Sequence, residues 1–203
     1  GDVERAWAEA EAVLPMALRV RLPFYLLGAD MLASMRTLFE GRLADCEPMI
    51  ARVLATGQSQ AANTGMQVYG AQMFALRSMQ GRLAEVEPLF KMLVQQLPNI
   101  PSFRAALAFL YSELERDEDA RRELDTLAAN GFSDLPRDTG WLASLTLLGQ
   151  VAAGLRDRDR SQRLYDLLLP YADRNVVVAL AAASNGSCER YLGILAAVLQ
   201  RSP

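Results

Sequence analysis

The sequence contains no histidine. That absence removes the commonest general base, the commonest metal ligand and the usual partner of a serine or cysteine nucleophile. The only two cysteines are Cys46 and Cys188, too few for the disulfide framework of a small secreted domain. We therefore expect a protein that is not an enzyme, with no catalytic residues, no metal site and no bound cofactor.

The sequence is also short of basic charge and of long hydrophobic runs. Its 203 residues carry a formal net charge of −3, whereas a general nucleic-acid-binding protein needs a basic face to neutralise phosphates. The same charge gives no reason to expect attraction to an anionic membrane. The longest apolar runs, such as "NVVVALAAAS", are too short to span a bilayer, and no N-terminal signal is visible. We expect a cytoplasmic protein whose partners include neither nucleic acid nor membrane.

Helix-forming residues are abundant instead. Alanine, leucine, glutamate and arginine dominate the sequence, and strand-like alternation is almost absent. Two segments, residues 43–57 and 83–98, place apolar residues on one helical stripe each. The stripes comprise Leu43, Cys46, Ile50, Val53 and Leu54 in the first segment, and Leu83, Val86, Phe90, Leu93 and Val94 in the second. This spacing predicts an all-α protein.

A repeated segment predicts how the helices are organised. "GRLADCEPMI" begins at Gly41 and "GRLAEVEPLF" at Gly81, and glycine at such a point can take φ > 0 after a helix. Equivalent positions recur at intervals typical of helical-hairpin repeats, and the interval from Gly81 to Glu115 has the tetratricopeptide length. We predict one helical-repeat domain over residues 1–203, an α-α superhelix of antiparallel hairpins. Its anchors lie at Gly1, Gly41, Gly81, Glu115, Arg156 and Gln200.

Five further segments carry a resemblance to a known family. They are "QVYGAQMFALRSMQGRLAEVEPLF", "FRAALAFLYSELERDEDARRELDTLAANGF", "LPRDTGWLASLTLLGQV", "LYDLLLPYADRNVVV" and "CERYLGILAAVL". They resemble the tetratricopeptide-like region C-terminal to the ATPase module of large bacterial regulators, both adenylate-cyclase-type and LuxR-type. The resemblance runs from about Met66 onward and includes no catalytic signature. It implies a regulatory module whose partner is a protein segment or the parent protein's own ATPase or cyclase domains. Because the chain starts and stops inside hairpins, we expect a fragment of a longer protein.

The first helix of each hairpin lines the concave surface of a tetratricopeptide array. Counting back from the anchors gives inward positions, none of them charged, which argues against a charged clamp for a peptide C-terminus and favours an apolar partner. Coverage of these positions by neighbouring helices or by further repeats is the alternative that remains open. The predicted partner-binding groove includes Met31, Met35, Ala71, Ala75, Ala105, Phe109, Thr146 and Gln150.

The resemblance also implies an alternative function. Related arrays in the maltose-type regulators are associated with inducer binding, so this module could sense a small-molecule effector. The ligand would lie in the groove and tighten the superhelix. Its expected contacts are Tyr69, Phe109, Gln150 and Trp141.

Two loops outside the groove carry polar groups that could meet a ligand or a partner. One loop contributes Arg137, Asp138 and Trp141, and the other contributes Tyr171, Arg174 and Asn175. Loop anchoring is the alternative role, with Asp138 or Thr139 as N-cap of the next helix. The β-branched run from Val176 to Val178 predicts an irregular helix or an extended loop.

Two remaining features have ordinary structural interpretations. The interleaved charges from Arg116 to Glu123 predict a solvated helix start, where acidic residues complement the helix dipole. Cys46 falls on a helical packing position, so we expect it to be buried. Cys188 enters a helix from a loop, where a helix N-terminus can lower the pKa of a thiol, and is the better candidate for a reactive cysteine.

Overall fold

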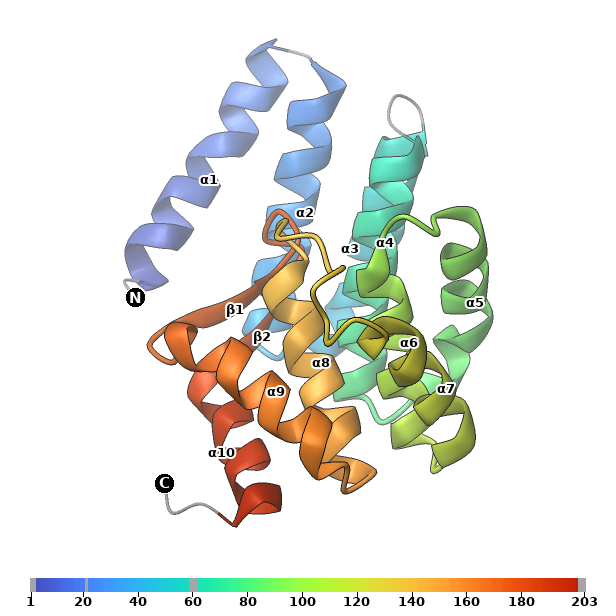
Figure 1. The fold of residues 1–203 in the computed structure, drawn as a ribbon. Coiled ribbons are helices and arrows are strands. Elements are labelled where there is room, and N and C mark those ends of the chain that lie inside the picture. The colour runs from blue at the N-terminus through green and yellow to red at the C-terminus, as the bar shows by residue number, and fades with distance from the viewer. Residues whose placement is uncertain (1–2, 21, 59–61, 201–203) are drawn as a thin grey trace. The chain divides into compact units, whose positions relative to one another are not determined.

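The computed structural model describes residues 3–20, 22–58 and 62–200, and these residues are mostly helical (Figure 1). They form ten α-helices, two short 3-10 helices and one two-stranded sheet. The helical content agrees with the composition. No helix in the described ranges combines the length and the apolar character needed to cross a membrane.

The chain divides into two compact units. Unit 1 holds the described residues up to Arg82 together with residues 179–184, and unit 2 holds residues 83–178 together with the described residues from Asn185 onward. Each unit has a helical core of its own.

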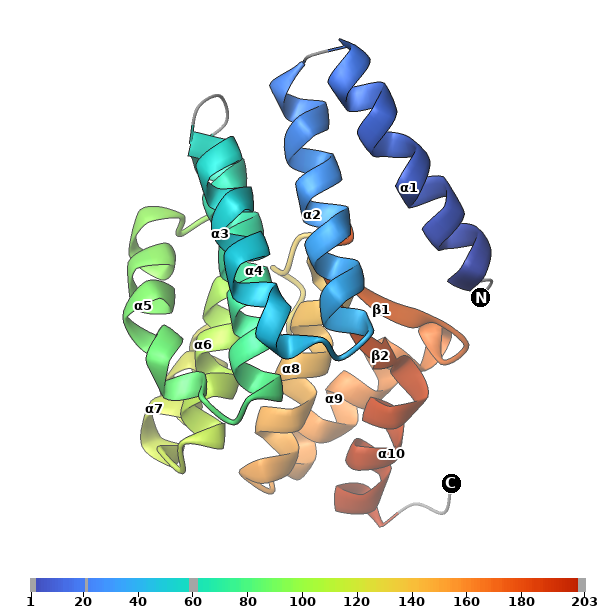
Figure 2. The same cartoon turned by 180° about the vertical axis from the view of Figure 1, so that it is seen from behind.

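Unit 1 is built from four helices in sequence order. They are α1 (Val3–Val20), α2 (Pro23–Phe39), α3 (Leu43–Gln58) and α4 (Ala62–Met79). Each helix packs on the next, and α2 also contacts α4; Figure 2 shows α1 beside α2. The core joins apolar side chains of α2, α3 and α4 to one residue from the segment 179–184. Its buried members are Leu27, Met31, Val53, Val68 and Ala182.

Unit 2 is built around two central helices, α6 (Pro101–Glu113) and α8 (Trp141–Gly154). The helix α6 contacts α5, α7 and α8, while α8 contacts α9, α10 and strand β1. Both central helices are buried along most of their length. The surrounding elements are η1 (Leu83–Val86), α5 (Glu87–Gln96), α7 (Asp117–Ala128), α9 (Arg158–Leu168), η2 (Leu169–Tyr171) and α10 (Cys188–Leu199).

The helices that end at the predicted anchors share one backbone geometry. The anchor residue is left-handed in every described case, with φ of 72°, 67°, 57°, 54° and 56° at Gly41, Gly81, Glu115, Arg156 and Gln200. After four of the anchors, the next residue donates its N–H to the carbonyl five positions back, at 2.8–3.1 Å. This is the Schellman C-cap. The positive φ predicted at the two glycines is confirmed, and the anchor at Gly1 lies outside the described residues.

The run from Val176 to Val178 is neither an irregular helix nor an unpaired loop, so that prediction was wrong. It forms β1 (Asn175–Val178), which pairs with β2 (Ala183–Ser187). Valine is β-branched and suits a pleated, half-buried strand, and Val176 is fully buried. The strand β1 also packs on α8, which supplies the apolar surface that an isolated hairpin lacks.

Candidate functional site

The predicted groove residues lie on α2, α4, α6 and α8, and half of them are buried. In unit 1, Met31 belongs to the core, whereas Met35, Ala71 and Ala75 are half-buried. In unit 2, Ala105, Phe109 and Thr146 are buried, and Gln150 is half-buried. The two sets belong to different units, so a continuous groove stays a prediction.

Exposed apolar side chains cluster instead at the end of α1 and the start of α2. Seven large apolar residues there are 42–62% exposed, and we call this set the α1–α2 apolar surface. Groups of exposed apolar side chains are typical of interaction sites on soluble proteins, whereas single exposed apolar residues are ordinary. The surface comprises Leu14, Met16, Leu18, Val20, Leu22, Phe24 and Tyr25.

The two halves of α1 explain why this surface exists. The first half is held against α2, where Trp7 packs edge-on against Phe39 at 5.6 Å and Arg36 lies 5.7 Å from the Trp7 ring and pairs with Glu11. In the second half, Ala17 is buried, while the apolar side chains before and after it in the sequence are exposed. A helix that is apolar nearly all round is normally covered. Contact with α2 covers only one side of this half.

Within the stretch of sequence that presents the α1–α2 apolar surface, the charges have one sign. The sequence has no acidic residue between Glu11 and Asp30, while Arg19 lies within that interval and is exposed. The Asp30 carboxylate is itself engaged, by Arg52 at 3.0 Å and by Thr56 at 2.8 Å. The surface is therefore apolar with a positive margin.

A second cluster, in unit 2, brings together the two loops whose polar residues the sequence singled out. The Arg137 guanidinium lies 4.7 Å from the centroid of the Trp141 ring, and Trp141 packs edge-on against Tyr171 at 5.4 Å. Arg137 Nη1 lies 3.5 Å from the Tyr171 hydroxyl. Trp141 is buried, Tyr171 is half-buried and Arg137 is exposed, so an aromatic base carries an accessible cation. We call these three residues the Arg137 cluster.

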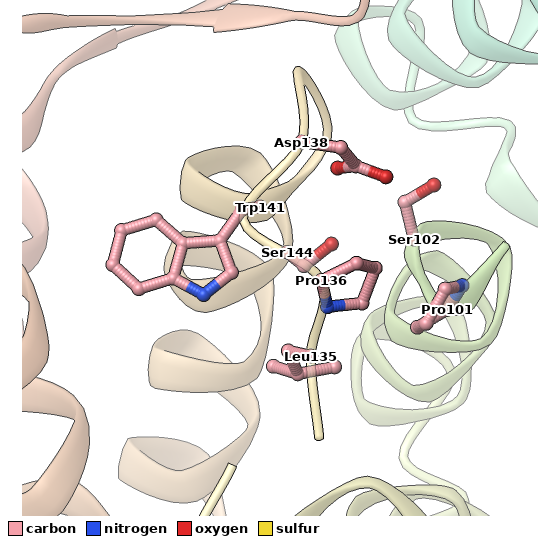
Figure 3. A pocket seen from close by; sticks show the side chains of 7 residues that line it. All are labelled: Pro101, Ser102, Leu135, Pro136, Asp138, Trp141 and Ser144. Atoms are coloured by element: carbon pink, nitrogen blue, oxygen red, sulfur yellow. The ribbon is translucent and has the colours of Figure 1, made fainter. Parts of the chain in front are cut away.

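Asp138 has an anchoring role. Its Oδ1 accepts the Gly140 N–H at 2.8 Å, which fixes the turn into α8, although Gly140 and not Asp138 is the N-cap residue. Figure 3 shows the Asp138 carboxylate directed toward Ser102, with the Trp141 ring extending away on the other side. The pocket between them has a volume of about 10 Å³, room for about one water molecule. It is lined by Pro101, Ser102, Leu135, Pro136, Asp138, Trp141 and Ser144.

The other polar candidates are accounted for by structure. Arg174 and Asn175 are exposed at the start of the hairpin. The acidic residues of the charged run, from Asp117 to Asp119, lie in the first turn of α7 as predicted, and Arg116 is the N-cap residue. Arg116 pairs there with Glu87 at 2.8 Å and with Asp119 at 2.5 Å, and its hydrogen bond lowers the pKa of Asp119.

Both cysteines are fully buried. Burial was predicted for Cys46. For Cys188 the prediction of a lowered thiol pKa was wrong, because burial raises that pKa and the thiol lies 3.7 Å from the Leu168 carbonyl oxygen. In the ranges that the structure describes, no group of three or more Cys, Asp or Glu side chains is arranged to hold a metal ion.

Comparisons of the chain with protein-family models, with curated proteins and with solved structures find no match. The class that the fold defines is therefore a mostly helical protein whose hairpins are closed by a repeated Schellman turn. The resemblance to the tetratricopeptide-like region of bacterial regulators stays a prediction.

Proposed function

We propose that this chain is a protein-interaction module built as a tetratricopeptide-like superhelix, and that it performs no chemistry of its own. The recurrence of one turn geometry at the predicted register supports a repeat array, and such arrays present extended binding surfaces. The resemblance adds a context, in which the module belongs to a bacterial signalling or transcription regulator. Its partner there is a protein segment or the regulator's own ATPase or cyclase domains.

The α1–α2 apolar surface is the observation that carries this proposal. Covering a fully exposed leucine or phenylalanine contributes about 1.5–3 kcal/mol, so each half-exposed side chain of the surface offers about 1 kcal/mol. The lost translational, rotational and side-chain freedom on association offsets part of this favourable free energy. The surface is therefore suited to weak, reversible binding. The shape of that partner follows from the element that presents the surface, since helices pack their apolar stripes against one another.

We assign the surface to an amphipathic helix of a partner protein with acidic residues beside its apolar stripe. Arg19 attracts such a helix, and the interval from Glu11 to Asp30 offers it no like charge. A second copy of this chain is a poorer occupant, because two surfaces with the same positive margin would repel each other. A bilayer is poorer too, because each basic residue near an anionic surface contributes only about 1 kcal/mol.

The test uses two designed helical peptides with the same leucine stripe, one flanked by glutamates and the other by lysines. We expect the glutamate peptide to bind more tightly in a calorimetric or anisotropy titration. Leu18→Ser should weaken its binding about fivefold, which corresponds to about 1 kcal/mol. Leu169→Ser is the matched control, because Leu169 is 50% exposed but lies in η2 of unit 2, while Leu18 is 57% exposed.

Three results would contradict this assignment. The first is equal binding of both peptides. The second is equal weakening by both leucine variants. The third is that neither peptide binds, while the chain binds anionic vesicles or self-associates in sedimentation and Leu18→Ser abolishes that binding or self-association.

One observation favours the alternative function, a small-molecule effector sensor. Trp141, a residue predicted to contact such an effector, lies in the Arg137 cluster, where hydrogen-bond donors gather beside aromatic rings. The adjoining pocket, at about 10 Å³, is far smaller than the several hundred Å³ of a metabolite site. An effector at this place would therefore bind on the exposed side of the cluster.

A further inference from the structure

The Arg137 guanidinium is fixed in place but not neutralised. It lies over Trp141, so one of its faces is occupied by the ring. A guanidinium held by its face keeps its N–H groups free, because they point outward in its own plane. Among the described residues its one hydrogen-bond partner is the Tyr171 hydroxyl, at a long 3.5 Å. No carboxylate in the described residues forms an ion pair with Arg137, and the adjacent Asp138 is held by the Gly140 N–H instead.

The groups around this guanidinium are hydrogen-bond donors. The Tyr171 hydroxyl can donate its hydrogen, and the structure gives it no acceptor among the described residues. The Trp141 indole carries one N–H, which is a donor only. Arg137 and the Tyr171 hydroxyl thus form a pair of neighbouring donors, one of them permanently charged, and such a pair is complementary to an anion.

We propose that Arg137, Trp141 and Tyr171 form a binding site for a carboxylate. The planar edge of a guanidinium matches the two oxygens of a carboxylate, and the Tyr171 hydroxyl donates to one of them. One unpaired arginine balances one negative charge, which fits a carboxylate better than a phosphate dianion. The site lies between the start of α8 and the end of η2, outside the predicted groove, and it does not depend on the α1–α2 apolar surface.

Nuclear magnetic resonance tests this site directly, because the chain has two tryptophans, and Trp7 in unit 1 serves as an internal reference. Sodium propionate is titrated into the ¹⁵N-labelled chain against sodium chloride at equal ionic strength. A peptide with one glutamate is then compared with its glutamine counterpart. We expect the Trp141 indole N–H resonance to shift saturably with propionate or with the glutamate peptide, while Trp7 stays unchanged. The tighter of the two ligands identifies the source of the carboxylate, a free acid or an acidic side chain.

Three variants complete the test. Arg137→Gln should weaken binding at least tenfold, and Tyr171→Phe, which keeps the ring, should weaken it about threefold. Arg121→Gln should change nothing, because Arg121 is also exposed but stacks on no aromatic ring of the described residues. Equal shifts with chloride, equal shifts at both tryptophans or unchanged binding by Arg137→Gln would overturn the proposal.

Discussion

Gln72 holds three segments of unit 1 together, and its replacement by leucine should cost about 2 kcal/mol of folding free energy. The side chain lies on α4 and is fully buried. Its Oε1 accepts a hydrogen bond from Ser34 Oγ of α2 at 2.8 Å. Its Nε2 donates to the Met31 carbonyl at 2.9 Å and to the Ala182 carbonyl at 3.0 Å. The segment 179–184 is therefore attached to α2 and α4 through one amide.

The magnitude follows from what each partner retains after Gln72→Leu, which nearly conserves volume. The single Ser34 hydroxyl hydrogen can turn to the Asp30 or the Met31 carbonyl, at 2.9 and 3.0 Å, so the loss at Ser34 is small. The Ala182 carbonyl keeps no side-chain donor from the described chain, and a buried acceptor without a partner costs about 1–3 kcal/mol. The extra apolar burial of leucine offsets part of the remaining loss. A net destabilisation of about 2 kcal/mol results.

Urea unfolding followed by circular dichroism measures this change, and hydrogen exchange locates it. The backbone amides of residues 179–184 should exchange faster in Gln72→Leu, while those of unit 2 helices should not. Gln67→Leu is the control, because Gln67 is a half-buried glutamine on the same helix. Destabilisation by Gln72→Leu within about 0.5 kcal/mol of that control would refute the reasoning, as would unchanged exchange in the segment 179–184.

Two further predictions concern stability. Gly57→Ala should lower the unfolding free energy by about 1–2 kcal/mol, because a Cβ there would lie 2.4 Å from the Gly65 Cα. Gly28→Ala should raise it by up to about 1 kcal/mol, because a Cβ at Gly28 would have no atom within 4 Å and alanine favours a helix more than glycine does. Thermal unfolding of both variants checks the opposite signs, and a shift in the same direction would contradict them. The hydrogen bond from Lys91 lowers the pKa of Glu87 in the folded protein. The ionised Glu87 therefore stabilises the fold fully above the pKa of an unfolded glutamate, about 4.3, and this stabilisation is lost as the pH falls through the lower pKa of the folded state. Glu87→Gln should remove this part of the acid sensitivity in unfolding curves measured from pH 7 to pH 2, and an unchanged pH dependence would count against it.

The register of the helix ends could be predicted because part of it is encoded locally. Gly41 and Gly81 sit in nearly identical segments, and glycine accepts a positive φ at no steric cost. Glu115 and Arg156 carry no such signal, and a left-handed conformation costs a non-glycine residue about 1 kcal/mol. Their positions came from repeat spacing alone, and they take the same φ.

The β-hairpin could not be predicted because only one of its strands has a strand-like sequence. The valines of β1 favour a strand, but β2 contains alanine, serine, asparagine and glycine, which do not. Its tip also uses alanine at positive φ, at Ala179 and Ala181, where local sequence favours other conformations. Pairing of the two strands and packing of β1 on α8 determine this segment, and the packing on α8 is a long-range effect that local sequence does not report.

The α1–α2 apolar surface was missed for a different reason. Apolar residues in a helical pattern predict burial, and sequence alone does not distinguish a buried stripe from an exposed one. The available signal was the apolar character of both sides of α1 after Glu11, together with the lack of any acid before Asp30. For the Arg137 cluster, the sequence indicates both loops but does not predict that their side chains contact each other, because that contact depends on the packing of α8 and η2.

Two arginines of unit 2 show how a structural cation differs from one available for binding. Arg116 and Arg137 each stack on an aromatic ring, Arg116 at 4.4 Å from Tyr111 and Arg137 at 4.7 Å from Trp141. The N–H groups of Arg116 are taken by two carboxylates on neighbouring helices, so its charge serves to join α5 to the start of α7. Those of Arg137 meet no carboxylate of the described chain. Because the stacking that orients the two cations is alike, the difference lies in the anion, which the fold supplies to Arg116 and a ligand must supply to Arg137.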